Sequence, residues 1–233
     1  MTKSVDIKAL DGSGSFPGYL AEPAEKPRAA VIVIQEIFGI NAGMRRRCDM
    51  LAEAGYLAIA PELFWRFAPG VELDPDIEPE LKQAFELMNK FDQDQGVRDI
   101  QAAMKAAREK LGGNGKVGAV GYCLGGRLAF MTAARTDVDA TVGYYGVGID
   151  QLLGEKDTIA RPLMLHIGKN DHLVDPAAQA RMHGALDGLS HVTLHDYEGV
   201  DHGFATEFGQ RRSEAAAVLA DERTAKFFAQ NLQ

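Results

Sequence analysis

The sequence is poor in cysteine and in basic residues, and it has no long hydrophobic run. Its 233 residues include two cysteines. There are 25 lysines and arginines but 33 aspartates and glutamates, which gives a formal net charge of -8. Nucleic-acid binding requires a concentrated basic surface, so this balance argues against a nucleic-acid partner. We interpret the one basic run, Arg45 to Arg47, as a solvent-exposed helix face.

No stretch of about 18 or more consecutive apolar residues occurs, so we predict no membrane span and no membrane partner. The first residues, Met-Thr-Lys-Ser-Val-Asp, lack the apolar segment of a secretory signal. We therefore expect a protein of the reducing cytoplasm, where disulfides are rare. Cys48 lies in a helical pattern and is expected to be a small buried side chain.

Strand-like and helix-like segments alternate along the chain without a linker, which predicts a single domain over residues 1–233. The predicted fold class is α/β, with an N-terminal hairpin followed by a mostly parallel sheet flanked by helices on both faces. The expected strands are 5–10, 16–21, 29–35, 56–60, 117–120, 140–145, 163–168 and 191–197. The expected helices are 42–54, 80–91, 95–111, 176–186 and 213–232, with another after residue 123. Residues 61–79 form an irregular aromatic loop, in which Trp65 either lines a pocket or packs the loop onto the body.

The central stretch is 116–126, Lys-Val-Gly-Ala-Val-Gly-Tyr-Cys-Leu-Gly-Gly. A short apolar strand, a glycine-flanked Cys123 and a helix-like segment are typical of a nucleophile elbow, with cysteine where serine is commoner. The glycines leave room for a tight turn, and the turn strains the backbone of the nucleophile. A sulfur at the start of a helix is favoured as thiolate. Taken alone, the pattern also fits a cysteine packed in a core, but the elbow interpretation requires Cys123 to stay free.

A thiol nucleophile needs a base and a group that orients the base. In the α/β-hydrolase fold these follow in the order nucleophile, acid and histidine, each in a loop after a strand. Cys123, Asp171 and His202 occur in that order, and each follows a strand-like run. Singly, Asp171 could cap a helix or turn and His202 could be an ordinary loop histidine. The agreement of all three placements favours a catalytic triad.

A metal centre is not predicted. The six histidines include no pair with the spacing of metal ligands, and two distant cysteines do not make a zinc site. We expect no metal and no other cofactor.

Three segments resemble the dienelactone hydrolase family of α/β-hydrolases: 121–126 (Gly-Tyr-Cys-Leu-Gly-Gly), 35–41 (Gln-Glu-Ile-Phe-Gly-Ile-Asn) and 142–148 (Val-Gly-Tyr-Tyr-Gly-Val-Gly). The loops of Asp171 and His202 are similar as well, and the resemblance extends from Val31 to the end of the chain. It implies a monomer without a cap domain that opens an enol-lactone such as carboxymethylenebutenolide, an intermediate of (chloro)catechol degradation. It also implies Cys123 as nucleophile, His202 as base and Asp171 as orienting acid.

The same resemblance gives roles to three further residues. It implies that Glu36 contacts the resting thiol and helps to generate the thiolate when substrate binds. A carboxylate near Cys123 would disfavour its ionisation until that carboxylate is displaced or takes up the proton. The backbone N–H groups of Leu124 and Ile37 would form the oxyanion hole.

The chain departs from the family prototype where the prototype holds its substrate's carboxylate with two arginines. The aligned residues are Leu81 and Thr206, and neither can replace a guanidinium. We therefore expect an altered or broadened substrate, although Lys82 or arginines 211 and 212 could bind a carboxylate from a new geometry. Phe38 and Tyr145 are candidates for the pocket wall, with plain packing as the alternative.

The predicted function is hydrolysis of a small-molecule enol-lactone or activated ester through a thioester. Two alternatives stay open at this point. One is a broad carboxylesterase or thioesterase, and the other is a non-catalytic α/β-hydrolase scaffold that binds a ligand or senses oxidation through its thiol. A complete triad argues against the second, because a binding protein has no need for all three residues.

Overall fold

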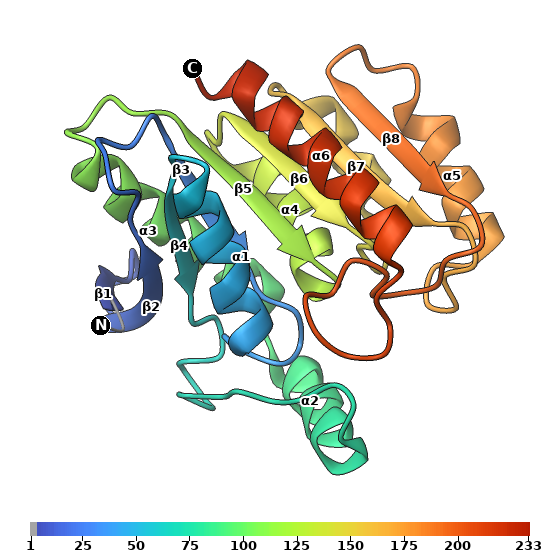
Figure 1. The fold of residues 1–233 in the computed structure, drawn as a ribbon, viewed down its shortest axis with the longest axis horizontal. Helices are drawn as coiled ribbons and strands as arrows, with labels where there is room; N and C mark the ends of the chain where they lie inside the picture. Colours follow the sequence, from blue (N-terminus) through green and yellow to red (C-terminus); the bar gives the residue numbers. More distant parts are fainter. Residues whose placement is uncertain (1–3) are drawn as a thin grey trace. The chain divides into compact units, whose positions relative to one another are not determined.

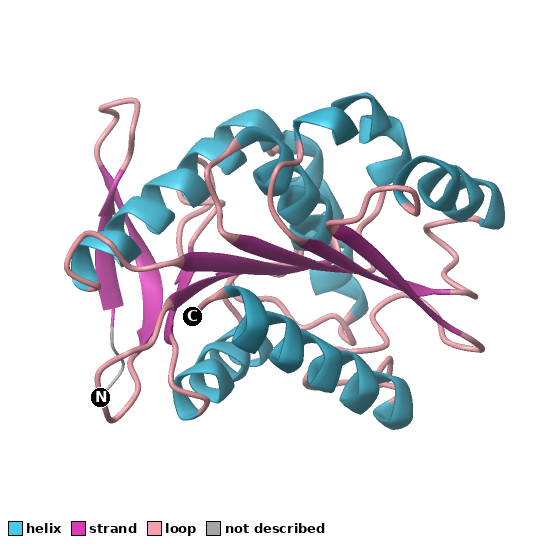
Figure 2. Ribbon diagram, turned by 90° about the horizontal axis from the view of Figure 1, so that it is seen from above, coloured by secondary structure: helices cyan, strands magenta, loops and turns pink. Residues whose placement is uncertain are grey.

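The computed structural model describes residues 4–233, which fall into two compact units divided after Gly118. Strand β5 (Val117–Tyr122) crosses this boundary. In each unit, helices lie on both sides of the strands (Figure 2), as the predicted fold class requires. The predicted organisation as a single domain stays a prediction.

The first unit contains four strands in the order β1 (Ser4–Lys8), β2 (Ser15–Ala21), β4 (Leu57–Pro61) and β3 (Ala30–Ile34). The first two pair as the predicted antiparallel hairpin, β2 pairs antiparallel with β4, and β3 runs parallel to β4. Every residue of β3 and β4 is buried. Their continuous apolar sequences fit this burial, because a strand covered on both faces has no polar side.

Helices α1 (Ala42–Glu53) and α3 (Gln93–Lys110) cover opposite faces of these strands (Figure 1). Both begin at the residue types that cap helices: the Asn41 side chain accepts a hydrogen bond from the backbone of Met44, and Asp92 accepts one from that of Gln95. Cys48 of α1 is fully buried, as expected, and burial raises the pKa of its thiol far above the usual value.

Two expectations for this unit were wrong in detail. Helix α2 (Glu78–Lys90) begins two residues before the predicted start, because Pro79 occupies the first turn, where proline is tolerated. In α1, Arg45 and Arg46 form ion pairs with Glu72 and Glu53, but Arg47 is only 5% exposed. The predicted solvent-exposed basic face therefore does not include Arg47.

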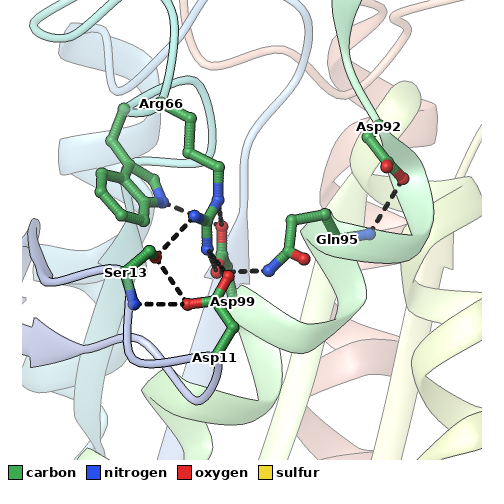
Figure 3. Close-up of polar contacts among 7 residues, drawn as sticks. Asp11, Ser13, Arg66, Asp92, Gln95 and Asp99 are labelled. Carbon is green, nitrogen blue, oxygen red and sulfur yellow. Dashed lines mark hydrogen bonds and ion pairs between the residues drawn. The ribbon is translucent and has the colours of Figure 1, made fainter.

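The aromatic loop after β4 is held by a buried carboxylate (Figure 3). Asp99 of α3 is 1% exposed and accepts hydrogen bonds from the Trp65 indole at 2.9 Å, from the Arg66 guanidinium at 2.9 Å and 3.3 Å, and from Gln95 at 3.3 Å. The Trp65 ring also stacks on Phe16, with 5.0 Å between the ring centroids. These contacts support the packing interpretation of Trp65.

The second unit contains β5, β6 (Ala140–Tyr144), β7 (Leu163–Gly168) and β8 (Val192–Tyr197) as successive neighbours. Strands β6, β7 and β8 are parallel. Helices α4 (Leu124–Arg135) and α5 (Pro176–Leu186) share one hydrophobic core with η1 (Ile149–Thr158), and α6 (Glu214–Asn231) lies over β6 and β7 (Figure 1). The short 3-10 helix η1 was not predicted.

Helix α6 is attached to the strands by a buried polar network. His166 of β7 bonds through Nδ1 to the Tyr197 hydroxyl at 2.8 Å and through Nε2 to the Thr224 hydroxyl at 3.0 Å. The Tyr144 hydroxyl contacts Thr224 at 2.6 Å and donates to Asp221 at 3.0 Å. Burial lowers the pKa of His166 well below its usual value, so the ring is neutral in this network.

Across residues 4–233, none of the helices combines the length and the apolar character that a bilayer crossing demands.

Candidate active site

The predicted strand, sharp turn and helix are all present around Cys123. Its backbone has φ 54° and ψ -114°, a conformation that residues with a side chain rarely adopt, and its N–H donates to the Tyr144 carbonyl at 3.1 Å. A Cβ atom at Gly121 would collide with the carbonyl oxygen of Gly125. Glycine at position 121 therefore lets the chain turn tightly enough to place Cys123 at the start of α4.

Cys123 forms no disulfide, and neither does Cys48. The Cys123 side chain is buried, with 8% of the residue exposed. It is the N-cap residue of α4, where the free N–H groups and the helix dipole stabilise negative charge. The expectation that this cysteine stays unpaired is confirmed.

Asp171 and His202 lie in the loops after β7 and β8, and they contact each other. His202 Nδ1 donates to Asp171 Oδ2 at 2.9 Å, and the second carboxylate oxygen, Oδ1, accepts the Leu173 backbone N–H at 2.8 Å. Asp171 is 3% exposed and His202 is 6% exposed. The hydrogen bond fixes both the orientation and the tautomer of the imidazole.

Cys123 affects the charge of His202. Burial lowers the pKa of His202, but the charge of Cys123 and the hydrogen bond to Asp171 outweigh burial and raise the pKa to about 10. The ring nitrogen Nε2 is buried and makes no hydrogen bond of ordinary geometry with any residue of the described chain. Hydrogen bonds between catalytic groups are often long in the absence of substrate. The second unit thus brings together the three residues predicted as a triad.

Tyr145 lies beside this triad and has a strained backbone. Its φ is 38°, and its ring meets His202 edge-on, with 5.1 Å between the ring centroids, and Phe204 at 5.5 Å. A non-glycine residue with positive φ at such a place is typical of functional sites. Its predicted role in the pocket wall stays a prediction.

Two residues that sequence reasoning overlooked, Asp201 and His172, form a second aspartate–histidine pair. Asp201 Oδ1 accepts the His172 ring Nδ1 at 2.8 Å, the His172 backbone N–H at 2.9 Å and the His202 backbone N–H at 2.6 Å. These bonds lower the pKa of Asp201 to about 2, although burial raises it. A signal was present, since each member of the pair adjoins a triad residue in sequence.

Asp171, His172 and Asp201 are also the cluster within residues 4–233 that could offer three ligand atoms to a metal ion. The hydrogen bonds of Asp171 to His202 and Leu173 already occupy both of its oxygens. The donor set is therefore committed to hydrogen bonds within the protein, and a metal is not part of the mechanism that we derive.

Two other predicted site residues belong to the second unit. Leu124 is the first residue of α4, so its N–H has no partner within the helix. Thr206 is buried at 8% exposure, its backbone N–H donates to Gly203 at 3.0 Å, and its hydroxyl has no hydrogen-bond partner among the described residues.

The other predicted residues, Glu36, Ile37, Phe38 and Leu81, belong to the first unit. The three that follow β3 are buried, at 6%, 3% and 2% exposure respectively. Leu81 is half-buried in the first turns of α2. Their predicted roles at Cys123 stay predictions.

Residues 16–232 match the family model of the dienelactone hydrolase family. The chain belongs to this family. The predicted family is therefore confirmed, and with it the α/β-hydrolase fold.

Relatives in the family share almost the full length of the chain. A protein of Azospirillum brasilense assigned as a carboxymethylenebutenolidase is 45% identical over 98% of both chains. The carboxymethylenebutenolidase of Pseudomonas putida is 39% identical over 98% of this chain and 97% of its own. A solved structure from Klebsiella pneumoniae, assigned as a dienelactone hydrolase, is 28% identical, covers 99% of both chains and has a TM-score of 0.85. The chain is thus a member of a family of hydrolases that cleave ester bonds.

Proposed function

We propose that this dienelactone hydrolase family member opens an enol-lactone or activated ester through a thioester intermediate on Cys123. The main observation behind this proposal is the buried Asp171–His202 hydrogen bond of 2.9 Å, together with the charge of Cys123, which raises the pKa of the same histidine. Relatives named carboxymethylenebutenolidase support a lactone as the substrate. A thiol, a base and an orienting acid form the minimal set for acyl transfer to sulfur.

The proposed reaction has two stages. His202 holds the proton that Cys123 releases, and the resulting thiolate attacks the carbonyl carbon. The bond from that carbon to the ring oxygen breaks, and the departing enolate oxygen accepts the proton from His202. A water molecule then gives a proton to His202 and attacks the thioester carbon. The carbon–sulfur bond breaks, His202 returns the proton to the Cys123 sulfur, and the product leaves as a carboxylic acid that loses its proton to solvent.

The oxyanion of each tetrahedral intermediate needs hydrogen-bond donors. We assign this role to the backbone N–H groups of Leu124 and Ile37, whose apolar side chains are not needed for it. An enolate is a good leaving group, and ring opening releases lactone strain. The proposal therefore includes slow turnover of simple alkyl esters, which lack such a leaving group.

Glu36 is proposed to control the resting thiol. A nearby carboxylate would hold Cys123 in its thiol form until substrate displaces the carboxylate, and a protected thiol resists oxidation. The variant Glu36→Gln is expected to fold normally and to shift the pH dependence of Cys123 alkylation. An unchanged alkylation profile would contradict this role.

The substrate is proposed to differ from that of the family prototype, because Leu81 and Thr206 replace its two carboxylate-binding arginines. The variants Leu81→Arg and Thr206→Arg, alone and together, are expected to improve kcat/KM for carboxylated dienelactones relative to uncharged ones. Arginine recognises a carboxylate by two parallel hydrogen bonds. A wild type that already prefers the carboxylated substrate would contradict the altered preference.

The function is tested by assaying dienelactones, activated aryl esters and alkyl esters with the wild type, Cys123→Ala and Cys48→Ala. We expect the wild type and Cys48→Ala to hydrolyse the lactones and Cys123→Ala to lose about 1000-fold or more in kcat. We also expect mass spectrometry to detect a thioester on Cys123 of the wild type. Fast turnover of alkyl or thiol esters instead would favour a broad carboxylesterase or thioesterase. No turnover, with reversible oxidation of Cys123, would favour a thiol sensor.

A further inference from the structure

Two aspartate–histidine pairs join the loop that carries Asp171 to the loop that carries His202. In one pair the aspartate comes from the first loop, and in the other pair it comes from the second. In the buried pair, Asp171 of the first loop accepts from the His202 ring at 2.9 Å. In the exposed pair, Asp201 of the second loop accepts from the His172 ring at 2.8 Å. Because residues 171–172 and 201–202 are neighbours in sequence, the two pairs cross-link the same two points of the chain.

The Asp201 carboxylate also accepts hydrogen bonds from the backbone of both loops. Its Oδ1 accepts the backbone N–H of His202 at 2.6 Å and that of His172 at 2.9 Å. The rings of His172 and His202 meet edge-on, with 6.2 Å between their centroids. One oxygen atom therefore receives a hydrogen bond from the catalytic base's own peptide unit and two from the residue that follows the catalytic acid.

The energy of the exposed ion pair does not explain this arrangement. The side chains of His172 and Asp201 are 65% and 58% exposed, and ion pairs this exposed contribute little to stability. We infer that the pair contributes by keeping the two loops in place, because a misplacement of about 1 Å in a catalytic group can lower the rate by roughly 100-fold.

We propose that Asp201 is a positioning residue that aligns His202 with Asp171 and Cys123 by fixing the two loops to one carboxylate oxygen. The proposal rests on the proposed function of the triad. Asp201 itself touches neither the thiol nor a reacting atom in this scheme, and it acts through the backbone of His202. The acceptor oxygen, rather than the negative charge, is the feature that matters.

Three variants distinguish the role of the acceptor oxygen of Asp201 from the roles of its negative charge and of the His172 ring. Asp201→Ala removes the acceptor, and we expect kcat/KM to fall by about 10- to 100-fold, mainly in kcat. His172→Ala keeps both backbone hydrogen bonds and is expected to lose less than Asp201→Ala. Asp201→Asn keeps an oxygen at the same place and is expected to stay within about threefold of the wild type.

The matched control is Asp187→Ala, since Asp187, the C-cap residue of α5, accepts from the ring of His183 in another aspartate–histidine pair near the surface. It should leave kcat/KM unchanged. Circular dichroism and thermal melting establish that each variant is folded, and Asp201→Asn serves as the test if Asp201→Ala does not fold. Wild-type kinetics for Asp201→Ala, or equal losses in Asp201→Ala and Asp201→Asn, would overturn the proposal.

A second readout needs no substrate. The rate of Cys123 alkylation by iodoacetamide, followed from pH 5 to pH 10, reports how His202 supports the thiolate. Asp201→Ala is expected to shift this profile toward that of His202→Gln, whereas Asp201→Asn and Asp187→Ala keep the wild-type profile. If no ester is hydrolysed but the profile shifts as expected, the proposed function fails and the positioning role stands. If esters are hydrolysed and the Asp201→Ala profile is unshifted, the positioning role fails alone.

Discussion

His202 shows how neighbouring groups can reverse the effect of burial on a single residue. Burial by itself disfavours an imidazolium, yet the charge of Cys123 and the hydrogen bond to Asp171 raise the pKa of His202 to about 10. The folded protein therefore keeps a proton on His202 at a pH where an unfolded chain, with a pKa near 6.5, has lost it. This difference links folding to pH.

The free energy of unfolding is expected to receive its full contribution from His202 below about pH 6.5 and to lose it as the pH rises toward 10. Urea titrations at a series of pH values measure this slope. In His202→Gln the loss of stability over that range should be smaller than in the wild type.

His195→Gln is the control, because burial lowers the pKa of His195 and places its titration below this range. The same slope in the wild type and in His202→Gln would contradict the assignment of the proton to His202.

At the scale of elements, the elbow depends on close backbone contacts between β5 and α4. Gly121→Ala would drive a Cβ atom into the Gly125 carbonyl. We expect this change to destabilise the fold by about 2–3 kcal/mol, the cost of overpacking, and to lower kcat because Cys123 shifts.

Gly184→Ala in α5 is the matched control. Nothing lies within 4 Å of an added Cβ atom there, and the backbone is helical. It should stabilise the protein by about 0.5–1 kcal/mol, because alanine favours helix over glycine. Equal melting temperatures for the two glycine variants would contradict the steric explanation of the elbow.

The connection of the aromatic loop to α3 depends on Asp99. Asp99→Ala leaves the Arg66 guanidinium and the Trp65 indole without their common acceptor. Because Arg66 is partly exposed, we expect a loss of about 2–4 kcal/mol, at or below the usual cost of breaking a buried ion pair. Chemical denaturation measures the loss, and Lys105→Ala, an exposed change on the same helix, should lie within about 0.5 kcal/mol of the wild type.

At the scale of the whole molecule, the family resemblance predicts a monomer. Light scattering coupled to size-exclusion chromatography should give a mass near 25.2 kDa at all concentrations. A mass near twice that value that persists on dilution would contradict the prediction. The cytoplasmic location and the absence of a cofactor are predictions of the same kind.

Much of the fold was predictable because local sequence dictates it. Continuous apolar runs marked β3, β4 and β7, and a glycine-flanked cysteine marked the elbow. The errors have physical causes. Pro79 was read as a loop residue although proline suits the first turn of a helix, and η1 has too polar a sequence to show a clear apolar period.

The sequence by itself determined the family and the order in which Cys123, Asp171 and His202 follow one another, because these depend on residue types at fixed places along the chain. Tertiary structure alone decided which polar groups meet. The 2.9 Å contact of His202 with Asp171 joins residues 31 positions apart, and the two bonds from His172 to Asp201 join residues 29 positions apart. The bond from Trp65 to the buried Asp99 joins residues 34 positions apart. No local pattern encodes such distances, since the packing of strands and loops sets them.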